Sequence, residues 1–337
     1  MNRSICIHSN RNLNTVKDNI HSVINYVESS KEIEFVLSDN SQDEEKEKYF
    51  KNIQNRNFNY LISPHKELTA NAYHCLENSK GKYICNLGDD DKIIKLNNKL
   101  DVITDDFVGI RPNFVVFTKE NGISNFSNFS IMQNTPVKRI EEYFKKCNHN
   151  NNTLYSFFDR SVYLPLISLI NTSHPFKHNG YFDWPVVLCF IAEGKIITDP
   201  NTVIFYNNER WDSDEKTEQS VNKLFTKNNH NEKLGNYLYM LLALDSYILL
   251  SRIGSSLSDK EKLEVASKVM MSYLKIFFKS LSIEKFNAKE MNFLTKLTSS
   301  NKIPDILKLM IDLVELSEPG KGNEYYYFYQ KATGRLL

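Results

Sequence analysis

The 337 residues of the chain are 41% hydrophobic and 25% charged, which is typical of a globular protein with one large domain and a smaller second one. The net charge is only +1, so we expect no nucleic-acid partner, because nucleic-acid binding needs a basic surface. The five cysteines include no Cys-x-x-Cys pair, which argues against a zinc site or a disulfide framework.

Short apolar runs alternate with helical segments along the first part of the chain. Residues 4–7 predict a strand that ends in a polar loop, and apolar residues then recur at helical spacing from residue 16 to 27. Residues 33–37 predict a second strand, which closes at Asp39. This order of elements is typical of a doubly wound α/β fold with a mostly parallel sheet.

Three consecutive carboxylates, Asp89, Asp90 and Asp91, follow residues 83–87, which predict a further buried strand. Open α/β sheets bind their ligands at the carboxyl ends of the strands. Adjacent like charges repel one another, and a divalent cation that also binds a diphosphate would offset this repulsion. A solvated acidic turn is the alternative for these three residues taken alone.

Three motifs in the first third of the chain resemble those of the family 2 glycosyltransferases. Residues 5–11 read Ile-Cys-Ile-His-Ser-Asn-Arg and residues 35–41 read Phe-Val-Leu-Ser-Asp-Asn-Ser, similar to the opening strand and the Ser-Asp turn of that family. Asn71 precedes residues 81–91, whose ending Leu-Gly-Asp-Asp-Asp is most similar to the bacterial branch of abequosyltransferase-like enzymes. The first loop is one residue shorter than the family pattern, and Gly88 stands where many relatives have the first aspartate of an Asp-x-Asp motif.

The resemblance implies a GT-A fold in which residues 1–215 form the nucleotide-sugar-binding and catalytic domain. A UDP-sugar is the expected donor, and Asp39 is expected to accept hydrogen bonds from its nucleobase. The positions that match the family's donor-binding motifs are Ser9, Arg11, Asp39, Asn71 and Asp89.

The same resemblance implies a metal site at Asp90 and Asp91. Mn²⁺ or Mg²⁺ held there would offset the charge that develops on the leaving nucleoside diphosphate. Further along the chain, Arg210 would either contact a phosphate or pair with Glu209 or Asp212 on the surface.

Asp183 is the candidate general base. It lies in the segment His-Asn-Gly-Tyr-Phe-Asp-Trp-Pro, just before the apolar helical run 186–192. This arrangement resembles the acidic element that opens a helix in the family, where a carboxylate takes the proton from the acceptor hydroxyl. The alternative is a structural N-cap of the helix.

The remaining chain divides into an irregular segment and a helical domain. Residues 122–152 are rich in asparagine and serine without clear periodicity, and they predict loops on the acceptor side. Residues 216–337 predict a helical C-terminal domain, with a capping box at Ser258 and Glu261. One helix has an apolar face that we expect to pack inside this domain; contact with the inner membrane or a homo-oligomer is the alternative. The residues of this face are Val265, Val269, Tyr273, Ile276 and Phe277.

The sequence thus predicts a metal-dependent, inverting glycosyltransferase. It would move a sugar from a nucleotide-diphosphate donor to a hydroxyl of a saccharide or lipid-linked saccharide, in the synthesis of a bacterial surface polysaccharide such as lipopolysaccharide O-antigen or capsule. A sugar-phosphate transferase on the same fold and a non-catalytic scaffold of a polysaccharide assembly complex are the alternatives. The first strand starts at residue 4 and the apolar run 237–250 contains Asp245, so we expect neither a leader nor a membrane span. The expected location is the cytoplasm, with peripheral contact at the inner membrane as a further hypothesis.

Overall fold

The computed structural model describes residues 2–97, 107–178 and 181–337. The chain forms two compact units, which are described one at a time. The first unit contains residues 1–168 and 194–212, and the second contains residues 169–193 and 213–337. The predicted boundary at residue 215 lies close to the last crossing between the units, but residues 169–193, which the sequence analysis placed in the catalytic domain, cluster with the helical unit.

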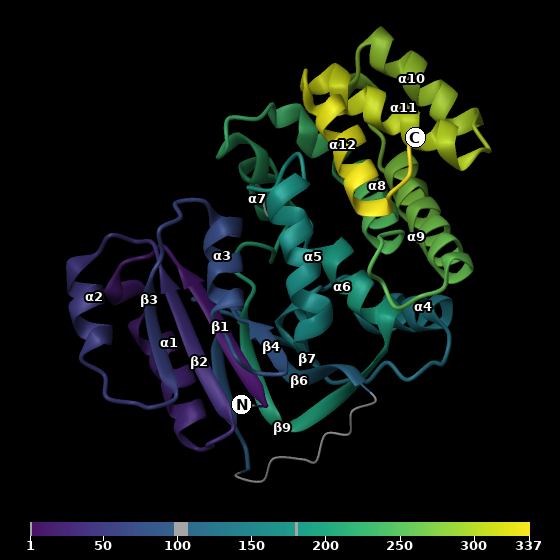
Figure 1. Ribbon diagram of the computed structural model, residues 1–337. Coiled ribbons are helices and arrows are strands. Elements are labelled where there is room, and N and C mark those ends of the chain that lie inside the picture. Colours follow the sequence, from purple (N-terminus) through teal and green to yellow (C-terminus); the bar gives the residue numbers. More distant parts are fainter. Residues whose placement is uncertain (1, 98–106, 179–180) are drawn as a thin grey trace. The chain divides into compact units, whose positions relative to one another are not determined.

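Four parallel strands form the first part of the sheet of unit 1. They are β1 (Arg3–Ser9), β2 (Ile33–Asp39), β3 (Phe58–Ile62) and β4 (Tyr83–Asn86), in the spatial order β3-β2-β1-β4 (Figure 1). All residues of β2 and six of the seven of β1 are buried, as expected for parallel strands covered on both faces.

The described part of unit 1 continues the sheet in the order β8-β6-β9-β5, with β7 pairing to β6. The strands β6 and β9 are parallel, whereas β8, β5 and β7 each pair antiparallel with a neighbour. The predicted α/β fold with a mostly parallel sheet is therefore confirmed, with antiparallel strands added. The bounds are β5 (Lys92–Lys95), β6 (Phe107–Thr118), β7 (Gly122–Ser127), β8 (Phe157–Asp159) and β9 (Lys195–Asn207).

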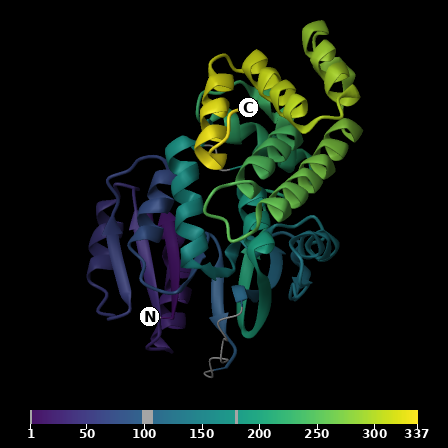
Figure 2. The same cartoon turned by 45° about the vertical axis from the view of Figure 1, so that its right-hand side comes forward.

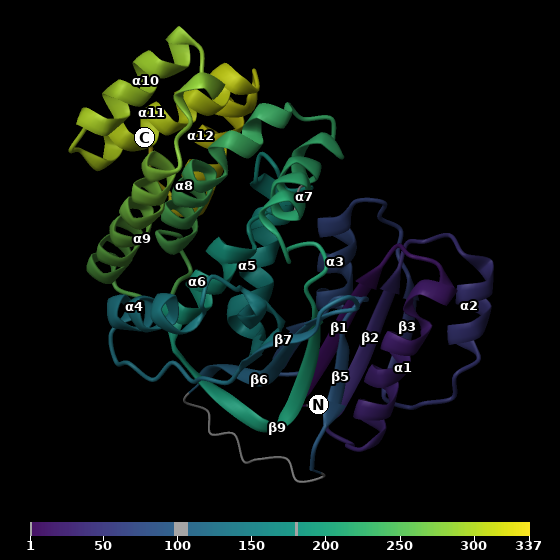
Figure 3. The ribbon, with the colours of Figure 1, turned by 180° about the vertical axis from the view of Figure 1, so that it is seen from behind.

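Helices α1 (Leu13–Glu28) and α3 (Leu68–Glu77) cover opposite faces of the parallel strands. Side chains at odd positions of β1 and β2, such as Ile5 and Phe35, pack with the apolar face of α1, which lies in front of these strands in Figure 3. The even position Cys6 contacts α3, because its Sγ donates to the carbonyl oxygen of Cys75. This alternation is the period-2 pattern of a strand that is buried on both faces.

The other helices of unit 1 are α2 (Glu44–Lys51), α4 (Pro136–Lys146) and the first part of α5 (Arg160–Ser173). The predicted loop at residues 122–152 is wrong in part, because it contains β7 and α4. The start of α4 is fixed by Thr135, whose side chain accepts a hydrogen bond from the Lys138 N–H, and by Pro136 in the first turn.

Unit 2 is helical, as predicted. It contains α6 (Asp183–Glu193), α7 (Asp214–Thr226) and α8 (Leu238–Leu250), and α8 packs along α9 (Asp259–Lys279) (Figure 2). Its last helices are α10 (Ala288–Ser299), α11 (Ile303–Ser317) and α12 (Lys321–Thr333). Short 3₁₀ turns at Asn152–Tyr155 in unit 1 and at Glu232–Tyr237 and Ile283–Lys285 in unit 2 complete the described elements.

The apolar face predicted on α9 lies mostly inside unit 2. Val265, Val269, Tyr273 and Phe277 are buried, whereas Ile276 is exposed. The capping box at Ser258 and Glu261 is confirmed. No helix in the described ranges is long and apolar enough to cross a membrane.

A buried polar cluster lies at the centre of unit 2. Asp245, in the middle of α8, accepts a hydrogen bond from the Tyr181 hydroxyl at 2.7 Å, and its other carboxylate oxygen lies 3.1 Å from His174 Nε2. The hydroxyls of Tyr181 and Tyr325 are 3.0 Å apart. Because burial and the carboxylate both disfavour ionisation of a phenol, the pKa of Tyr181 lies well above its ordinary value. The cluster connects His174, just after α5, and Tyr181, just before α6, with α8 and α12 through the interior of this unit.

Candidate active site

Most of the predicted donor-binding residues lie at one edge of the sheet in unit 1. Ser9 and Asp39 end the neighbouring strands β1 and β2 and are opposite each other in the register, and Asp89–Asp91 follow β4 on the other side of β1. Parallel strands place their carboxyl ends at the same edge, so residues far apart in the sequence meet there.

Asp39 is buried and its carboxylate is held from three sides. Oδ1 accepts hydrogen bonds from Lys46 Nζ at 2.9 Å and from the Ser41 N–H at 2.9 Å, and Oδ2 accepts one from the Tyr60 hydroxyl at 2.6 Å. Burial and the carboxylate next to it raise the pKa of Tyr60, so its hydroxyl stays a donor at neutral pH.

Lys46 is the residue at the site that the sequence analysis missed. Its side chain is fully buried, and besides Asp39 its ammonium donates to Ser9 Oγ at 2.9 Å and to the Arg11 carbonyl oxygen at 2.8 Å. The signal in the sequence is its spacing: Lys46 lies four residues before Phe50, which is the buried aromatic residue of α2, so both side chains are on the inner face.

A hollow of about 180 Å³ opens beside Asp39, beyond the ends of β2 and β3. Its lining includes Asp39 and Tyr60 together with Asn40, Ser63, His65 and Lys66. The hollow is therefore bordered by both hydrogen-bond donors and hydrogen-bond acceptors, and the Asp39–Tyr60 pair forms part of its wall.

Asn71 is in α3, next to the site, and its side-chain polar atoms are hydrogen-bonded to β2. Its Oδ1 accepts a hydrogen bond from Ser38 Oγ at 2.7 Å, and its Nδ2 donates to the Ser38 carbonyl oxygen at 3.3 Å. Its side chain is buried. These contacts tie α3 to the end of β2, next to Asp39.

Asp89 is bonded to the loop that follows β1. Its Oδ2 accepts a hydrogen bond from Ser9 Oγ at 2.7 Å, its Oδ1 lies 3.4 Å from Arg11 Nη1, and its carbonyl oxygen accepts from Asn19 Nδ2 at 3.0 Å. Ser9 thus connects Lys46 and Asp89, and the polar ends of β1, β2 and β4 form one network.

Asp90 is the most accessible of the three carboxylates. Its side chain is 25% exposed, and Oδ2 accepts from Arg11 Nη2 at 3.0 Å and from Arg210 Nη2 at 2.7 Å. Burial acts against ionisation, but the two guanidinium groups outweigh it and lower the pKa of Asp90. Arg210, 59% exposed, therefore reaches a carboxylate of the site, a pairing that the sequence analysis did not consider.

Asp91 turns inward. Its side chain is almost fully buried and Oδ1 accepts a hydrogen bond from the Asn207 N–H at 2.9 Å. Burial, with added repulsion from the neighbouring carboxylates, raises the pKa of Asp91 to about 8. Gly88 makes room for this arrangement, because a Cβ at that position would lie 2.7 Å from Asp91 Oδ2 and 3.0 Å from Asp90 Oδ1.

The carboxylates of this site fit a metal ion that takes most of its ligands from phosphate and water. Among the described residues no group of three or more His, Cys, Asp or Glu side chains is placed to hold a metal ion. Mg²⁺ and similar ions bind at one or two carboxylates together with phosphate oxygens and water. Asp90 meets this need, since it is ionised and partly exposed.

Asp183 lies in unit 2, as the first residue of α6. It is half-buried and occupies the first turn, where a carboxylate interacts favourably with the helix dipole. The residue before the helix is Phe182, so Asp183 is inside the helix and not in the N-cap position that the alternative prediction gave it.

Comparison with known proteins agrees with this geometry. Residues 4–159 match the model of glycosyl transferase family 2, a range that contains Ser9, Asp39 and Asp89–Asp91. Residues 4–159 are therefore similar to a family 2 glycosyltransferase domain. No curated protein sequence matches the chain.

Solved structures show the same fold over almost the whole chain. S. aureus TarS 1–349 superposes with a TM-score of 0.51 at 12% identity, covering 99% of this chain and 92% of that one. Its complex with UDP-GlcNAc gives a TM-score of 0.50 at 11% identity, covering 94% and 82%. Together with the family match, these superpositions confirm the predicted GT-A fold followed by a helical C-terminal region.

Proposed function

We propose that this protein is an inverting, metal-dependent glycosyltransferase that uses a UDP-sugar as donor and a saccharide or lipid-linked saccharide as acceptor. The observation that carries the proposal is the network from Lys46 through Ser9 to Asp89 and on to Arg11 and Asp90, within the residues that match glycosyl transferase family 2. The UDP-GlcNAc complex of S. aureus TarS, on the same fold, supports a nucleotide-sugar donor.

In this proposal the nucleobase lies in the hollow beside Asp39, whose carboxylate is fixed by Lys46 and Tyr60. The diphosphate lies at the edge of β1 and β4. Arg11 and Arg210, which pair with Asp90, would turn their guanidinium groups to phosphate oxygens, a geometry for which arginine is well suited. Ser9, Asn71 and Asp89 hold the ends of the strands in place.

Mn²⁺ or Mg²⁺ at Asp90, with Asp91 as the second expected carboxylate, would neutralise charge on the diphosphate as it leaves. Asp183 would take the proton of the acceptor hydroxyl as the new bond to the anomeric carbon forms and the bond from that carbon to the diphosphate oxygen breaks. The products are the glycosylated acceptor and the nucleoside diphosphate. Synthesis of a bacterial surface polysaccharide, as in the abequosyltransferase-like branch, is the setting that the sequence motifs favour.

Thermal unfolding with UDP, GDP, dTDP, CDP and CMP, each with and without Mn²⁺, tests this proposal. A ligand at about 100 times its Kd adds roughly 2.7 kcal/mol to the free energy of unfolding. We expect a shift with UDP that needs Mn²⁺, and we expect Asp90→Asn to lose the part that depends on Mn²⁺. If no nucleotide shifts the unfolding transition, we would reject a donor site at this edge of the sheet. A non-catalytic scaffold would then be the favoured alternative. Mass spectrometry of the product separates sugar transfer from sugar-phosphate transfer, because only the latter adds phosphorus to the acceptor.

A further inference from the structure

The segment that leads from α5 into α6 is held at two places by a single side chain. Asp245, in the middle of α8, has its Oδ1 3.1 Å from Nε2 of His174, just after α5, and its Oδ2 accepts a hydrogen bond from the Tyr181 hydroxyl at 2.7 Å. Tyr181 lies two residues before Asp183, the first residue of α6. The three side chains that make these contacts are buried, so both described ends of the segment are fixed from inside unit 2.

Packing alone does not explain a carboxyl group at this position of α8. All residues from Met240 to Leu250 are buried, and Asp245 is fully buried among them. Burial of a polar group costs free energy unless its hydrogen bonds are satisfied, and an apolar side chain of similar size is often at least as favourable for stability. What the carboxyl group supplies, and an apolar side chain would not, is a fixed position for each of its partners.

The ring of His174 is held in one orientation. Its Nδ1 accepts a hydrogen bond from the Phe176 N–H at 3.0 Å, so the neutral ring carries its proton on Nε2, the nitrogen next to Asp245. The centre of the ring also lies 5.5 Å from the centre of the Phe182 ring, and Phe182 is the residue directly before Asp183. The contacts of the buried cluster therefore reach the start of α6.

The hydroxyl of Tyr181 has a second partner. It lies 3.0 Å from the hydroxyl of Tyr325, a fully buried residue of α12. The next residue, Phe182, accepts a backbone hydrogen bond from the Val186 N–H at 3.1 Å, which joins it to the first turn of α6. Because Tyr181 and Phe182 are both held, the direction in which α6 starts is fixed, and with it the backbone of Asp183.

We infer that Asp245 is a positioning residue for Asp183: the buried polar cluster of unit 2 sets where the carboxylate at the start of α6 lies. This role rests on the proposed function, because Asp183 is the general base of that proposal. A general base must lie within hydrogen-bond reach of the proton that it takes, and a misplacement of about 1 Å can lower the rate about a hundredfold. A side chain that never touches the substrate therefore affects the reaction.

Trp184, directly after Asp183, reports on the start of α6 without any substrate. The chain has two tryptophans, so Trp211→Phe leaves Trp184 as the only one. In that background we expect Tyr181→Phe to raise the quenching of Trp184 fluorescence by acrylamide about twofold or more, since loss of one hydrogen bond shifts a local equilibrium by a factor of this order. Asp245→Ala should act in the same direction, and Asp245→Asn, which keeps one acceptor oxygen, should act less.

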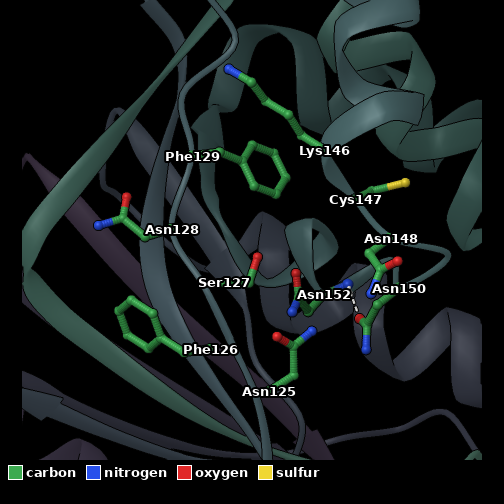
Figure 4. Close-up of a pocket in the computed structure, with 10 residues that line it drawn as sticks. All are labelled: Asn125, Phe126, Ser127, Asn128, Phe129, Lys146, Cys147, Asn148, Asn150 and Asn152. Carbon is green, nitrogen blue, oxygen red and sulfur yellow. Dashed lines mark hydrogen bonds between the residues drawn. The ribbon is translucent and has the colours of Figure 1, made fainter.

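Ser127→Ala is the matched control in unit 1. The Ser127 hydroxyl, which lines the hollow shown in Figure 4, accepts a hydrogen bond from the guanidinium of the fully buried Arg111 at 2.7 Å. Each of the two variants thus removes one hydroxyl that is bonded at 2.7 Å to a buried ionisable side chain. We expect Ser127→Ala to lower the thermal stability by a similar amount and to leave the quenching of Trp184 unchanged.

The release of UDP from UDP-GlcNAc or UDP-glucose, with water as acceptor, connects the cluster with the chemistry. Tyr181→Phe should lower this rate about tenfold and keep the UDP-dependent thermal shift, because the base is displaced and the donor site is not. In the Asp183→Asn background the same change should lower the rate by less than about twofold, since residues that act as a unit have non-additive effects. Effects of the two variants that multiply would overturn the inference.

The two readouts separate the positioning role from the proposed function. If Asp183→Asn leaves the rate intact while Tyr181→Phe still raises the quenching of Trp184, the general base lies elsewhere and the placement of α6 by the cluster stands. If Asp183→Asn lowers the rate but Tyr181→Phe changes neither rate nor quenching, the base stands and the positioning role is overturned. If neither donor is turned over, the quenching of Trp184 alone decides: equal quenching in Tyr181→Phe and Ser127→Ala would overturn the role.

Discussion

At the scale of single residues, the site depends on one buried ammonium group. Lys46 brings Ser9, Asp39 and the Arg11 carbonyl together, and no other described lysine has a fully buried side chain. A buried charge contributes little net stability while its partners are present, but removal of one partner leaves the other charge uncompensated.

We predict that Lys46→Met lowers the free energy of unfolding by about 3–5 kcal/mol, because the Asp39 carboxylate stays buried without its cation. Urea unfolding followed by circular dichroism measures the change. Lys51→Met is the matched control on the same helix: its pair with Glu47 is exposed, and its loss should cost less than about 0.5 kcal/mol. A loss for Lys46→Met as small as that for the control would contradict the assigned role.

Asp91 should make stability depend on pH with a defined sign. Its pKa is about 8 in the folded chain against an ordinary value of 3.8, so the folded state holds the proton more tightly than the unfolded state. The stabilisation is complete below about pH 4 and is lost as the pH rises towards 8. We therefore predict that Asp91→Asn, which keeps an acceptor for the Asn207 N–H, is more stable relative to the parent at pH 8 than at pH 5.

Urea unfolding at the two pH values, in EDTA and without nucleotide, tests this prediction. Asp90→Asn is the control that should show no difference between the two pH values, because Arg210 and Arg11 lower the pKa of Asp90 below its ordinary value of 3.8 and its stabilisation is lost only at more acidic pH. If Asp91→Asn shifts stability equally at pH 5 and pH 8, the buried carboxyl does not titrate in this window.

At the scale of elements, the sequence was most informative where an apolar run ends in polar residues. The strand ends at Asp39 and Asp89 could be predicted because buried strands are continuous apolar runs, and the parallel order then placed them at one edge. Helix α2 gave a weaker signal, since six of its eight residues are charged and only the spacing to Phe50 distinguishes Lys46 from its neighbours.

The strand β7 could not be predicted from hydrophobic periodicity. Asparagine and serine favour loops by local propensity, yet in β7 the pairing with the long strand β6 outweighs that preference. Helix α4, in contrast, has signals that the sequence analysis missed: Pro136, Ile140 and Tyr143 are buried at helical spacing, and Thr135-Pro136 is an N-cap followed by a proline in the first turn. Tertiary pairing, which no local pattern encodes, decided the structure of β7.

Asp183, the predicted general base, is in α6. A catalytic role of this residue can be distinguished from a structural role at the start of the helix. We predict that Asp183→Asn keeps the nucleotide-dependent thermal shift but lowers the rate of sugar transfer by about a hundredfold or more, as for a lost general base. Asp214→Asn is the matched control, because Asp214 is also an acid in the first turn of a helix, α7. It should change stability by less than about 1 kcal/mol and leave the rate intact. Equal loss of nucleotide binding and rate in Asp183→Asn would point to a structural role.

At the scale of the whole molecule, sequence reasoning predicted both the α/β part and the helical part but not how the chain divides between them. The pattern becomes helical in residues 216–337, so a boundary was expected at residue 215. The chain enters the helical unit at residue 169, leaves it at 193 and returns at 213. Residues 169–193 look like a continuation of the α/β part because a helix between strands is the usual α/β order.

The division predicts that the fragment of residues 1–215 does not fold into a stable domain. In unit 2, residues Pro185–Ala192 of α6 are buried, and Tyr181 is hydrogen-bonded to Asp245 and Tyr325. The fragment would expose these residues of α6 and lose both partners of Tyr181. At about 25 cal/mol per Å² of apolar surface, exposure of eight buried residues of this kind costs more free energy than the whole free energy of unfolding of a typical domain. We expect the fragment to aggregate in size-exclusion chromatography and to lack a cooperative thermal transition, whereas the full chain shows one. A monomeric fragment that melts cooperatively would show instead that residues 169–193 find an alternative packing within the α/β part.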